Sequence, residues 1–60
     1  MPIVNIDWFE GRTVEQKKEI ARKITDTIVD VAGCPEDAVT VIFNDKARHD
    51  IAKAGIISTS

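Results

Sequence analysis

The residue of this 60-residue chain that is best suited to take part in a reaction is Pro2, which directly follows Met1. A small second residue generally permits removal of the initiator methionine, so we expect a processed chain that begins with proline. A Met-Pro start is also common in chains that make no use of the proline nitrogen, so support for a chemical role must come from the rest of the sequence. The ring nitrogen would be a secondary amine, which can act as a base near neutral pH when burial and a nearby cation lower its pKa. Pro2 is therefore the candidate general base.

Few other side chains suggest a recognisable site. The guanidinium of Arg12 can hold a carboxylate through two parallel hydrogen bonds, although a solvated surface charge is the simpler interpretation of this residue alone. Cys34 and His49 lack the neighbours that a metal site needs, and Cys34 is interpreted as a small apolar side chain. The three glycines are too far apart for a phosphate-binding loop. The sequence thus predicts neither a metal nor a cofactor.

The composition narrows the class of protein. Hydrophobic residues make up 43% of the chain and charged residues 30%. The net charge of −2 and the lack of a basic run argue against nucleic acid or an anionic membrane as the main partner. No apolar run approaches the roughly 20 residues of a membrane span, and the first residues lack the basic start of a signal peptide. We therefore expect a cytoplasmic protein without nucleic-acid or membrane partners.

The short length makes self-association the expected source of stability. A chain of about 60 residues buries only about 60% of its unfolded surface, and such chains usually add disulfides, metals or partner subunits. Cys34 is the sole cysteine and His49 the sole histidine, which leaves partner subunits as the open route. We predict one domain over residues 1–60 that assembles into a homo-oligomer.

The first expected element is a strand over residues 2–9. Its alternation places Val4, Ile6 and Trp8 on one fully apolar face, whereas the opposite face mixes apolar and polar residues. We expect the apolar face to meet the domain's own core, which makes Trp8 a packing residue, and the mixed face to suit a subunit contact.

A long amphipathic helix should follow. Thr13 and Gln16 fit a capping box at its start, while Gly33 and Pro35 are typical of its end. Apolar residues recur at steps of three and four and predict one buried face, composed of Val14, Ile20, Ala21, Ile24, Ile28, Val31 and Ala32.

The second strand is predicted over residues 38–44, which are β-branched and alternating. Strand, helix and strand in this order form a right-handed βαβ unit with parallel strands. The tail over residues 45–60 is too apolar for a free end, so we expect it to pack on a neighbouring subunit as a short hairpin. The predicted fold class is α/β (α+β): a single βαβ unit with two parallel strands, one long helix and a hairpin-like tail, which oligomerises to complete its sheet.

Three short motifs at fixed spacing support a function for Pro2. They are Pro2-Ile3-Val4-Asn5-Ile6, then Glu10-Gly11-Arg12-Thr13, then Glu15-Gln16-Lys17 at the helix entry. As a set they resemble the 4-oxalocrotonate tautomerase family, and the likeness continues through the βαβ order to the tail. The resemblance implies that Pro2 is a general base that interconverts enol and keto forms of small 2-oxo acids such as 2-hydroxymuconate, without a cofactor. It also implies that Arg12 binds a substrate carboxylate, and that dimers assemble into hexamers with shared sites.

Two positions of the implied site depart from the family pattern. Thr40 stands where many members carry a second arginine, so a short hydroxyl replaces a permanent cation. Ile51 stands where the family has an aromatic residue, which keeps an apolar wall and loses the ring. The missing charge could come from Lys46, Arg48 or Lys53, in the tail or on another subunit, although a solvated cation is the simpler interpretation of each.

Two other functions compete with the tautomerase hypothesis. Pro2 could assist water addition to an unsaturated acid, as in related hydratases and dehalogenases, and the carboxylates available to activate water are Asp7, Asp45 and Asp50. Alternatively, the chain is an oligomeric scaffold that keeps the fold and lacks catalysis, an option that Thr40 and Ile51 make serious. Retention of Met1 would favour the scaffold, because the Pro2 nitrogen would then be an amide.

Overall fold

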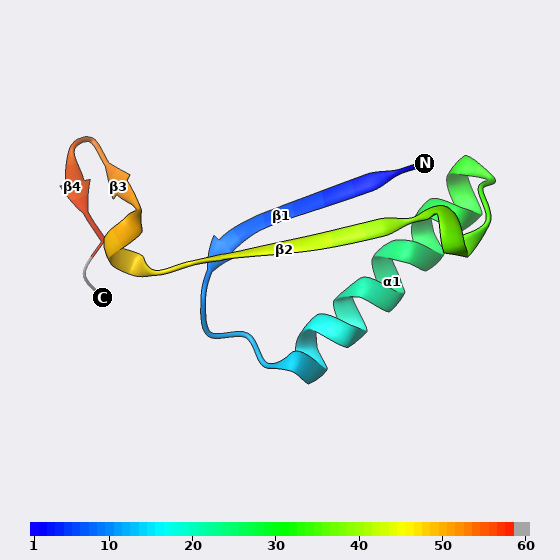
Figure 1. The fold of residues 1–60 in the computed structure, drawn as a ribbon, viewed down its shortest axis with the longest axis horizontal. Helices are drawn as coiled ribbons and strands as arrows, with labels where there is room; N and C mark the ends of the chain where they lie inside the picture. Colours follow the sequence, from blue (N-terminus) through cyan, green and yellow to red (C-terminus); the bar gives the residue numbers. More distant parts are fainter. Residues whose placement is uncertain (59–60) are drawn as a thin grey trace.

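The structure is a computed structural model that describes residues 1–58. The predicted domain and the predicted tail both extend to residue 60, so their last two residues, Thr59 and Ser60, lie outside the described residues. One long helix lies along a pair of strands, and the tail forms a small hairpin beyond them (Figure 1). In chain order the elements are β1 (Ile3–Phe9), α1 (Val14–Ala32), a 3-10 turn (Glu36–Ala38), β2 (Thr40–Lys46), a second 3-10 turn (Arg48–Asp50), β3 (Ala52–Lys53) and β4 (Ile56–Ile57).

The predicted βαβ unit is confirmed. β1 and β2 run parallel, in a register that pairs Ile3 with Thr40 and Phe9 with Lys46. The second strand begins and ends two residues later than expected. It begins later because the Ala38 N–H donates to the Pro35 carbonyl at 3.1 Å and closes a 3-10 turn. This turn returns the chain from α1 to the start of β2.

Both predicted ends of the helix are confirmed. The Gln16 N–H donates to the Thr13 hydroxyl at 3.1 Å, and the Gln16 side chain accepts from the Thr13 N–H at 2.9 Å. These bonds satisfy two main-chain donors that would otherwise lack partners at the helix start. At the other end Gly33 adopts a left-handed conformation with φ of 76°, which glycine accepts without steric cost.

The helix covers only part of its predicted apolar face. Ile20, Ile24 and Ile28 are half-buried against the sheet, as expected. Val14 and Val31 are 66% and 80% exposed, and Ala32 is exposed as well, so the prediction that these three are buried is wrong. All three lie in the terminal turns, and two strands spaced by about 4.8 Å are too narrow to cover the full face of a helix about 10 Å wide.

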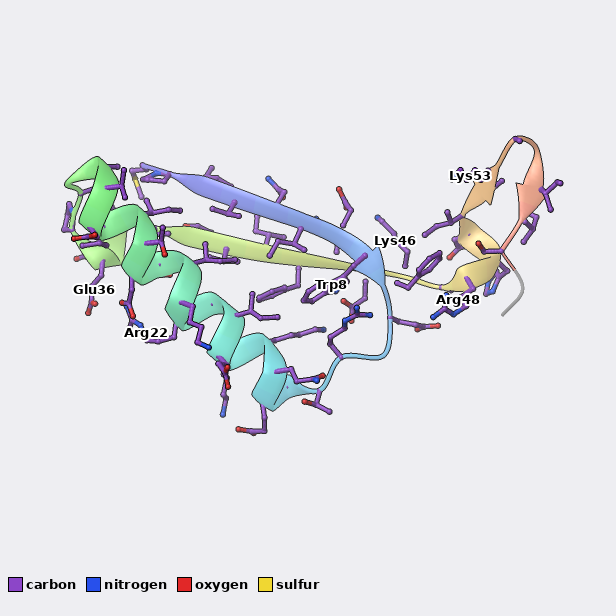
Figure 2. All side chains as sticks on the ribbon, turned by 180° about the vertical axis from the view of Figure 1, so that it is seen from behind. Trp8, Arg22, Glu36, Lys46, Arg48 and Lys53 are labelled. Atoms are coloured by element: carbon purple, nitrogen blue, oxygen red, sulfur yellow. The ribbon has the colours of Figure 1, made fainter. Side chains whose placement is uncertain are left out.

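The tail forms the predicted hairpin. β3 and β4 are antiparallel, and Ala52 pairs with Ile57. The turn between them has φ of 54° at Ala54 and 81° at Gly55, the two left-handed residues of a tight hairpin turn. The hairpin stands apart from α1 in both views and exposes Ile56, so its expected contact with another subunit stays a prediction (Figures 1 and 2).

The isolated chain has an incomplete core. No residue of the described part is fully buried, and its accessible surface of 4613 Å² exceeds the value of about 3,900 Å² typical of a compact monomer of this mass. The radius of gyration is 14.6 Å, against about 10 Å for a compact chain of this length. On the sheet face opposite α1, Ile3 is 63% and Ile42 40% exposed. The single chain thus leaves apolar surface on both sides of its sheet in contact with solvent.

No helix within residues 1–58 combines the length and the apolar character that a membrane crossing requires.

Candidate functional site

The structure places the four predicted site residues in two separate pairs. Pro2 and Thr40 lie together where the strands start, and the Thr40 N–H donates to the Pro2 carbonyl at 3.0 Å. Arg12 and Ile51 lie at the other end, beyond Phe9. Seven residues of extended chain separate Pro2 from Phe9, which corresponds to about 23 Å. A single chain therefore does not bring Pro2 to Arg12.

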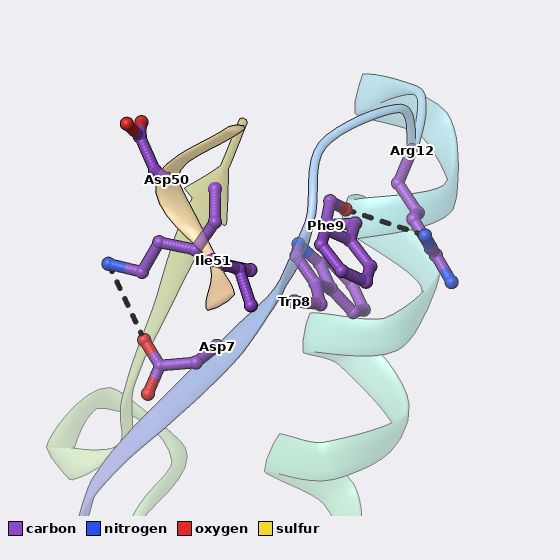
Figure 3. Close-up of a pocket in the computed structure, with 7 residues that line it drawn as sticks. Asp7, Trp8, Phe9, Arg12, Asp50 and Ile51 are labelled. Carbon is purple, nitrogen blue, oxygen red and sulfur yellow. Dashed lines mark hydrogen bonds and ion pairs between the residues drawn. The ribbon is translucent and has the colours of Figure 1, made fainter. Parts of the chain in front are cut away.

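An open depression of about 750 Å³ occupies the end of the sheet near Arg12 (Figure 3). Aromatic and aliphatic side chains combine there with both signs of charge, as is typical of small-molecule sites. The lining residues are Asp7, Trp8, Phe9, Arg12, Lys46, Asp50 and Ile51. Two of the four site residues expected from the sequence, Arg12 and Ile51, are among them.

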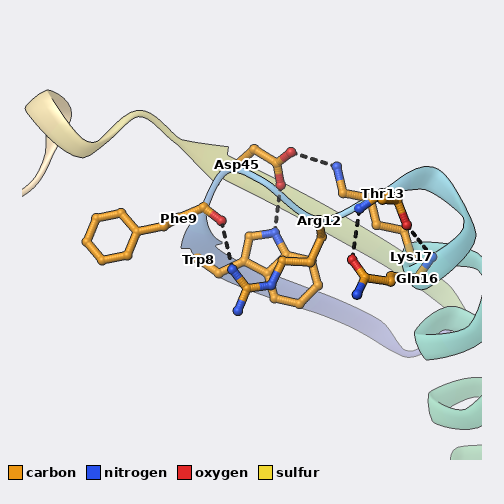
Figure 4. A network of polar contacts seen from close by, with 7 residues as sticks. All are labelled: Trp8, Phe9, Arg12, Thr13, Gln16, Lys17 and Asp45. Carbon is orange, nitrogen blue, oxygen red and sulfur yellow. Dashed lines mark hydrogen bonds and ion pairs between the residues drawn. The ribbon is translucent and has the colours of Figure 1, made fainter. Parts of the chain in front are cut away.

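Trp8 both packs and lines the depression. Its ring stacks on Phe43 with centroids 5.4 Å apart, which confirms the predicted packing role. The guanidinium of Arg12 lies over the same indole, 5.1 Å from its centroid (Figure 4). Such a cation–π contact holds the cation in place without neutralising it. The Trp8 ring therefore positions the guanidinium of Arg12.

Arg12 is free to bind an anion. It forms no ion pair with any residue from 1 to 58, and its one hydrogen bond is a long one of 3.4 Å from Nη1 to the Phe9 carbonyl. Its place follows from the chain path, since Gly11 turns with φ of 126° between β1 and the helix cap. Most of its N–H donors stay available for a carboxylate.

A hydrogen-bonded cluster of Lys17, Asp45 and Trp8 fixes the indole at its Nε1 atom. Asp45 accepts a hydrogen bond from Trp8 Nε1 at 2.6 Å and one from Lys17 Nζ at 2.6 Å (Figure 4). These bonds, that from Lys17 first, lower the pKa of the Asp45 carboxyl below its usual range. Lys17 also lies 5.9 Å from the Phe43 ring centroid. Sequence analysis missed this cluster, because only the β1–β2 register places Trp8 opposite Asp45.

The lowered pKa of Asp45 predicts a pH-dependent contribution to stability. An unfolded aspartate titrates near pH ~3.9, and the folded value is lower, so the contribution is present above about pH 4 and is lost as pH falls through the folded pKa. We expect Asp45→Asn to lower the urea midpoint at pH 7, and the gap from wild type to narrow below about pH 4. Fluorescence of Trp8, the sole tryptophan, reports unfolding at fixed protein concentration. Asp37→Asn, on an exposed turn, is the matched control, and an unchanged gap at low pH would contradict the assignment.

Some of the other charged side chains near the depression form ion pairs, and others do not. Lys46 Nζ lies 3.9 Å from an Asp7 oxygen, and His49 Nε2 lies 3.6 Å from an Asp50 oxygen. Arg48 forms no ion pair within the described range of the chain, and its guanidinium lies 4.3 Å from the Phe9 ring centroid. No cluster of three or more histidine, cysteine, aspartate or glutamate side chains with metal-binding geometry occurs among residues 1–58.

Comparison with known proteins identifies relatives over nearly the whole chain. Residues 2–57 match the sequence profile of the family described as "Tautomerase enzyme". A "Probable tautomerase" of Lactococcus lactis subsp. lactis is 58% identical over 55 residues, which cover 92% of this chain and 90% of that protein. Another, of Streptococcus pneumoniae, is 56% identical over 45 residues, which cover 75% of each chain.

Solved structures agree with this assignment. A crystal structure described as a 4-oxalocrotonate tautomerase homologue has a TM-score of 0.88 and 30% identity, covering 95% of this chain and 90% of the other. A 4-oxalocrotonate tautomerase isozyme of Methylibium petroleiphilum has a TM-score of 0.85 and 32% identity, covering 95% and 89% of the two chains. The matched residues span both strands, the helix and the depression that contains Arg12. The chain therefore belongs to the tautomerase family.

Proposed function

We propose that the protein is a cofactor-independent tautomerase that interconverts enol and keto forms of small 2-oxo acids, with 2-hydroxymuconate as the model substrate. After removal of Met1, the Pro2 nitrogen takes the proton of the enol hydroxyl and returns it to a carbon of the conjugated chain. The double bonds shift as the carbonyl forms, so atoms balance without a redox step or water. Arg12 binds a substrate carboxylate and offsets the charge that develops on the substrate.

The observation that carries this proposal is the unpaired guanidinium of Arg12 in a half-apolar depression, in a chain of the tautomerase family. A carboxylate ligand would satisfy the free donors of Arg12, while Trp8 and Ile51 exclude water from the reacting carbons. Thr40, next to Pro2, is assigned a substrate contact through its hydroxyl.

A second copy of the chain would bring Pro2 to this depression. Within residues 1–58, β1 pairs with β2 alone, so its other edge is open. The Pro2 carbonyl and the Glu10 N–H both bond to β2, at 3.0 and 2.9 Å. Because main-chain groups alternate along a strand, those of Ile3, Asn5 and Asp7 point to the open edge. An antiparallel β1–β1 pairing of two copies can therefore use these groups.

Such pairing has the correct geometry for a shared site. A two-fold axis near the middle of β1 would place Pro2 of one copy opposite the region from Trp8 to Glu10 of the other. Trp8 and Phe9 line the depression that contains Arg12. The same pairing would begin to cover the apolar surface that the single chain leaves exposed, and further copies, as in a hexamer, would cover the rest.

A second candidate function, water addition to an unsaturated acid, is favoured by one observation. Asp7 and Asp50 both line the depression, and a carboxylate there could activate water. Asp45, the third acid considered, is held by Trp8 and Lys17 and has a lowered pKa, which makes it a poor base.

One set of assays separates the candidate functions. The tautomerase predicts ketonisation of 2-hydroxymuconate and phenylenolpyruvate, followed by ultraviolet absorbance. The hydratase or dehalogenase predicts no ketonisation but turnover of a haloacrylate. An inactive protein whose intact mass still includes Met1 would indicate the scaffold.

The role of Arg12 is tested by its replacement with alanine. We expect Arg12→Ala to raise KM by about 10- to 100-fold for both substrates, because a charge-assisted pair of hydrogen bonds is lost. Arg12→Lys should recover part of this loss. Arg22→Ala is the matched control, because Arg22 pairs with Asp26 and Glu36 away from the depression. An unchanged KM in Arg12→Ala would remove Arg12 from the site.

A further inference from the structure

A second guanidinium without an ion-pair partner in the described part of the chain lies beside the depression. Arg48 begins the short turn after β2, and its Cζ atom lies 4.3 Å from the centroid of the Phe9 ring, which lines the depression. No acidic side chain among residues 1–58 forms an ion pair with Arg48. The contact with Phe9 restrains the guanidinium and leaves its hydrogen-bond donors free.

The two neighbouring cations are less suited to bind an anion. Lys46 lines the depression, but its ammonium lies 3.9 Å from Asp7, which already supplies a negative charge. Neither Arg48 nor Lys53 lines the depression itself, but Arg48 lies over the ring of the lining residue Phe9, whereas Lys53, on β3, forms no such contact with the rings among residues 1–58. A lysine is also a point charge, whereas the planar fork of an arginine matches both oxygens of a carboxylate.

Phe9 connects Arg48 with Arg12. The Phe9 carbonyl accepts the hydrogen bond from Arg12 Nη1 at 3.4 Å, and the Phe9 ring carries Arg48. Two guanidinium groups that form no ion pair with residues 1–58 thus contact one residue at the wall of one depression. A ligand with two negative groups could pair with both of them. In Figure 3 the Asp50 carboxylate points away from Phe9 and Arg12, so it does not substitute for that ligand.

We propose that Arg48 is a second carboxylate-binding residue, which together with Arg12 selects substrates that carry two carboxylates over substrates that carry one. The selection of a substrate for turnover rests on the proposed tautomerase function, whereas the binding of a dianion does not. Arg48 thereby supplies from the tail a cation that position 40, a threonine, does not provide.

Steady-state kinetics on two substrates test the proposal. We expect Arg48→Ala to raise KM about 10-fold for the dicarboxylate 2-hydroxymuconate and to change KM less than about 2-fold for the monocarboxylate phenylenolpyruvate. Arg48→Lys should lie between wild type and Arg48→Ala for the dicarboxylate. Lys53→Ala, the matched tail control, should leave both KM values unchanged. Equal effects of Arg48→Ala on the two substrates, or no effect on either, would overturn the assignment.

Calorimetric titration with inert ligands separates this proposal from the function. We expect adipate, a dicarboxylate, to bind the wild-type assembly more tightly than hexanoate, and Arg48→Ala to remove most of that difference. If this result holds while neither enol substrate is converted, the tautomerase proposal fails and the dianion site stands. If turnover depends on Pro2 but adipate gains nothing from Arg48, the function stands and the role of Arg48 is refuted.

Discussion

Pro2→Ala is expected to lower kcat/KM for 2-hydroxymuconate by about 100- to 10,000-fold, the usual contribution of a positioned general base. Alanine also permits removal of Met1, but its primary amine lacks the ring that fixes the proline nitrogen in place. The variant should fold and assemble as the wild type does, because the side chain of Pro2 takes no part in the β1–β2 hydrogen bonds. Initial rates below KM, with intact mass to verify processing, provide the measurement.

The other proline offers a matched control for this experiment. Pro35→Ala alters the turn after α1, on a different element from Pro2, and should leave kcat/KM within about 2-fold. A Pro2→Ala enzyme with full activity would exclude the ring nitrogen as the base. Since Arg12 and Arg48 bind the substrate in the proposed mechanism, their replacement should change KM, whereas Pro2→Ala should act chiefly on kcat.

Asn5→Pro is expected to dissociate the assembly and to abolish activity, with a loss of about 100-fold or more. The main-chain N–H of Asn5 points to the open edge of β1, so proline removes an interchain donor and spares the β1–β2 ladder. Because the isolated chain buries no described residue fully, we also expect a lower thermal midpoint. Analytical ultracentrifugation reports the mass, and Asn5→Ala, which keeps the N–H, should remain assembled.

A complementation experiment tests the shared site without disturbing β1. Pro2→Ala and Arg12→Ala are each weakly active alone, but a mixed dimer pairs the intact Pro2 of one chain with the intact Arg12 of the other. Refolding the two variants together at equal concentrations should restore about a quarter of wild-type activity, measured below KM, because half of the dimers are mixed and each has one intact site. Absence of any recovery would contradict the β1–β1 arrangement.

The local elements could be predicted from the sequence because their causes are local. A capping box at Thr13, a left-handed glycine at Gly33 and strict alternation in residues 2–9 each act within a few residues, and all three predictions are confirmed. The start of β2 was predicted two residues early, since Ala38 belongs to a 3-10 turn that the path of the chain requires and Val39 caps that turn. The exposure of Val14 and Val31 depends on the width of the sheet, which periodicity does not contain.

The candidate site was predictable in part. The motifs and the family resemblance indicated Pro2, Arg12, Thr40 and Ile51 as candidates, but they could not show that these four residues lie in two pairs at opposite ends of the strands. Separation in space follows from strand length and register, which emerge only when β1 and β2 pair.

The sequence by itself therefore determined the order of the elements, the family and the candidate reactive residues, because periodicity, capping and motif spacing are properties of neighbouring residues. Only the tertiary structure decided which charges meet. It joined Asp45 to Trp8 and Lys17, left Arg12 and Arg48 without an ion-pair partner among residues 1–58, and placed Pro2 at the far end of β1, about 23 Å from Phe9. These relations depend on strand register and on the path of the tail, which bring together residues that are distant along the chain.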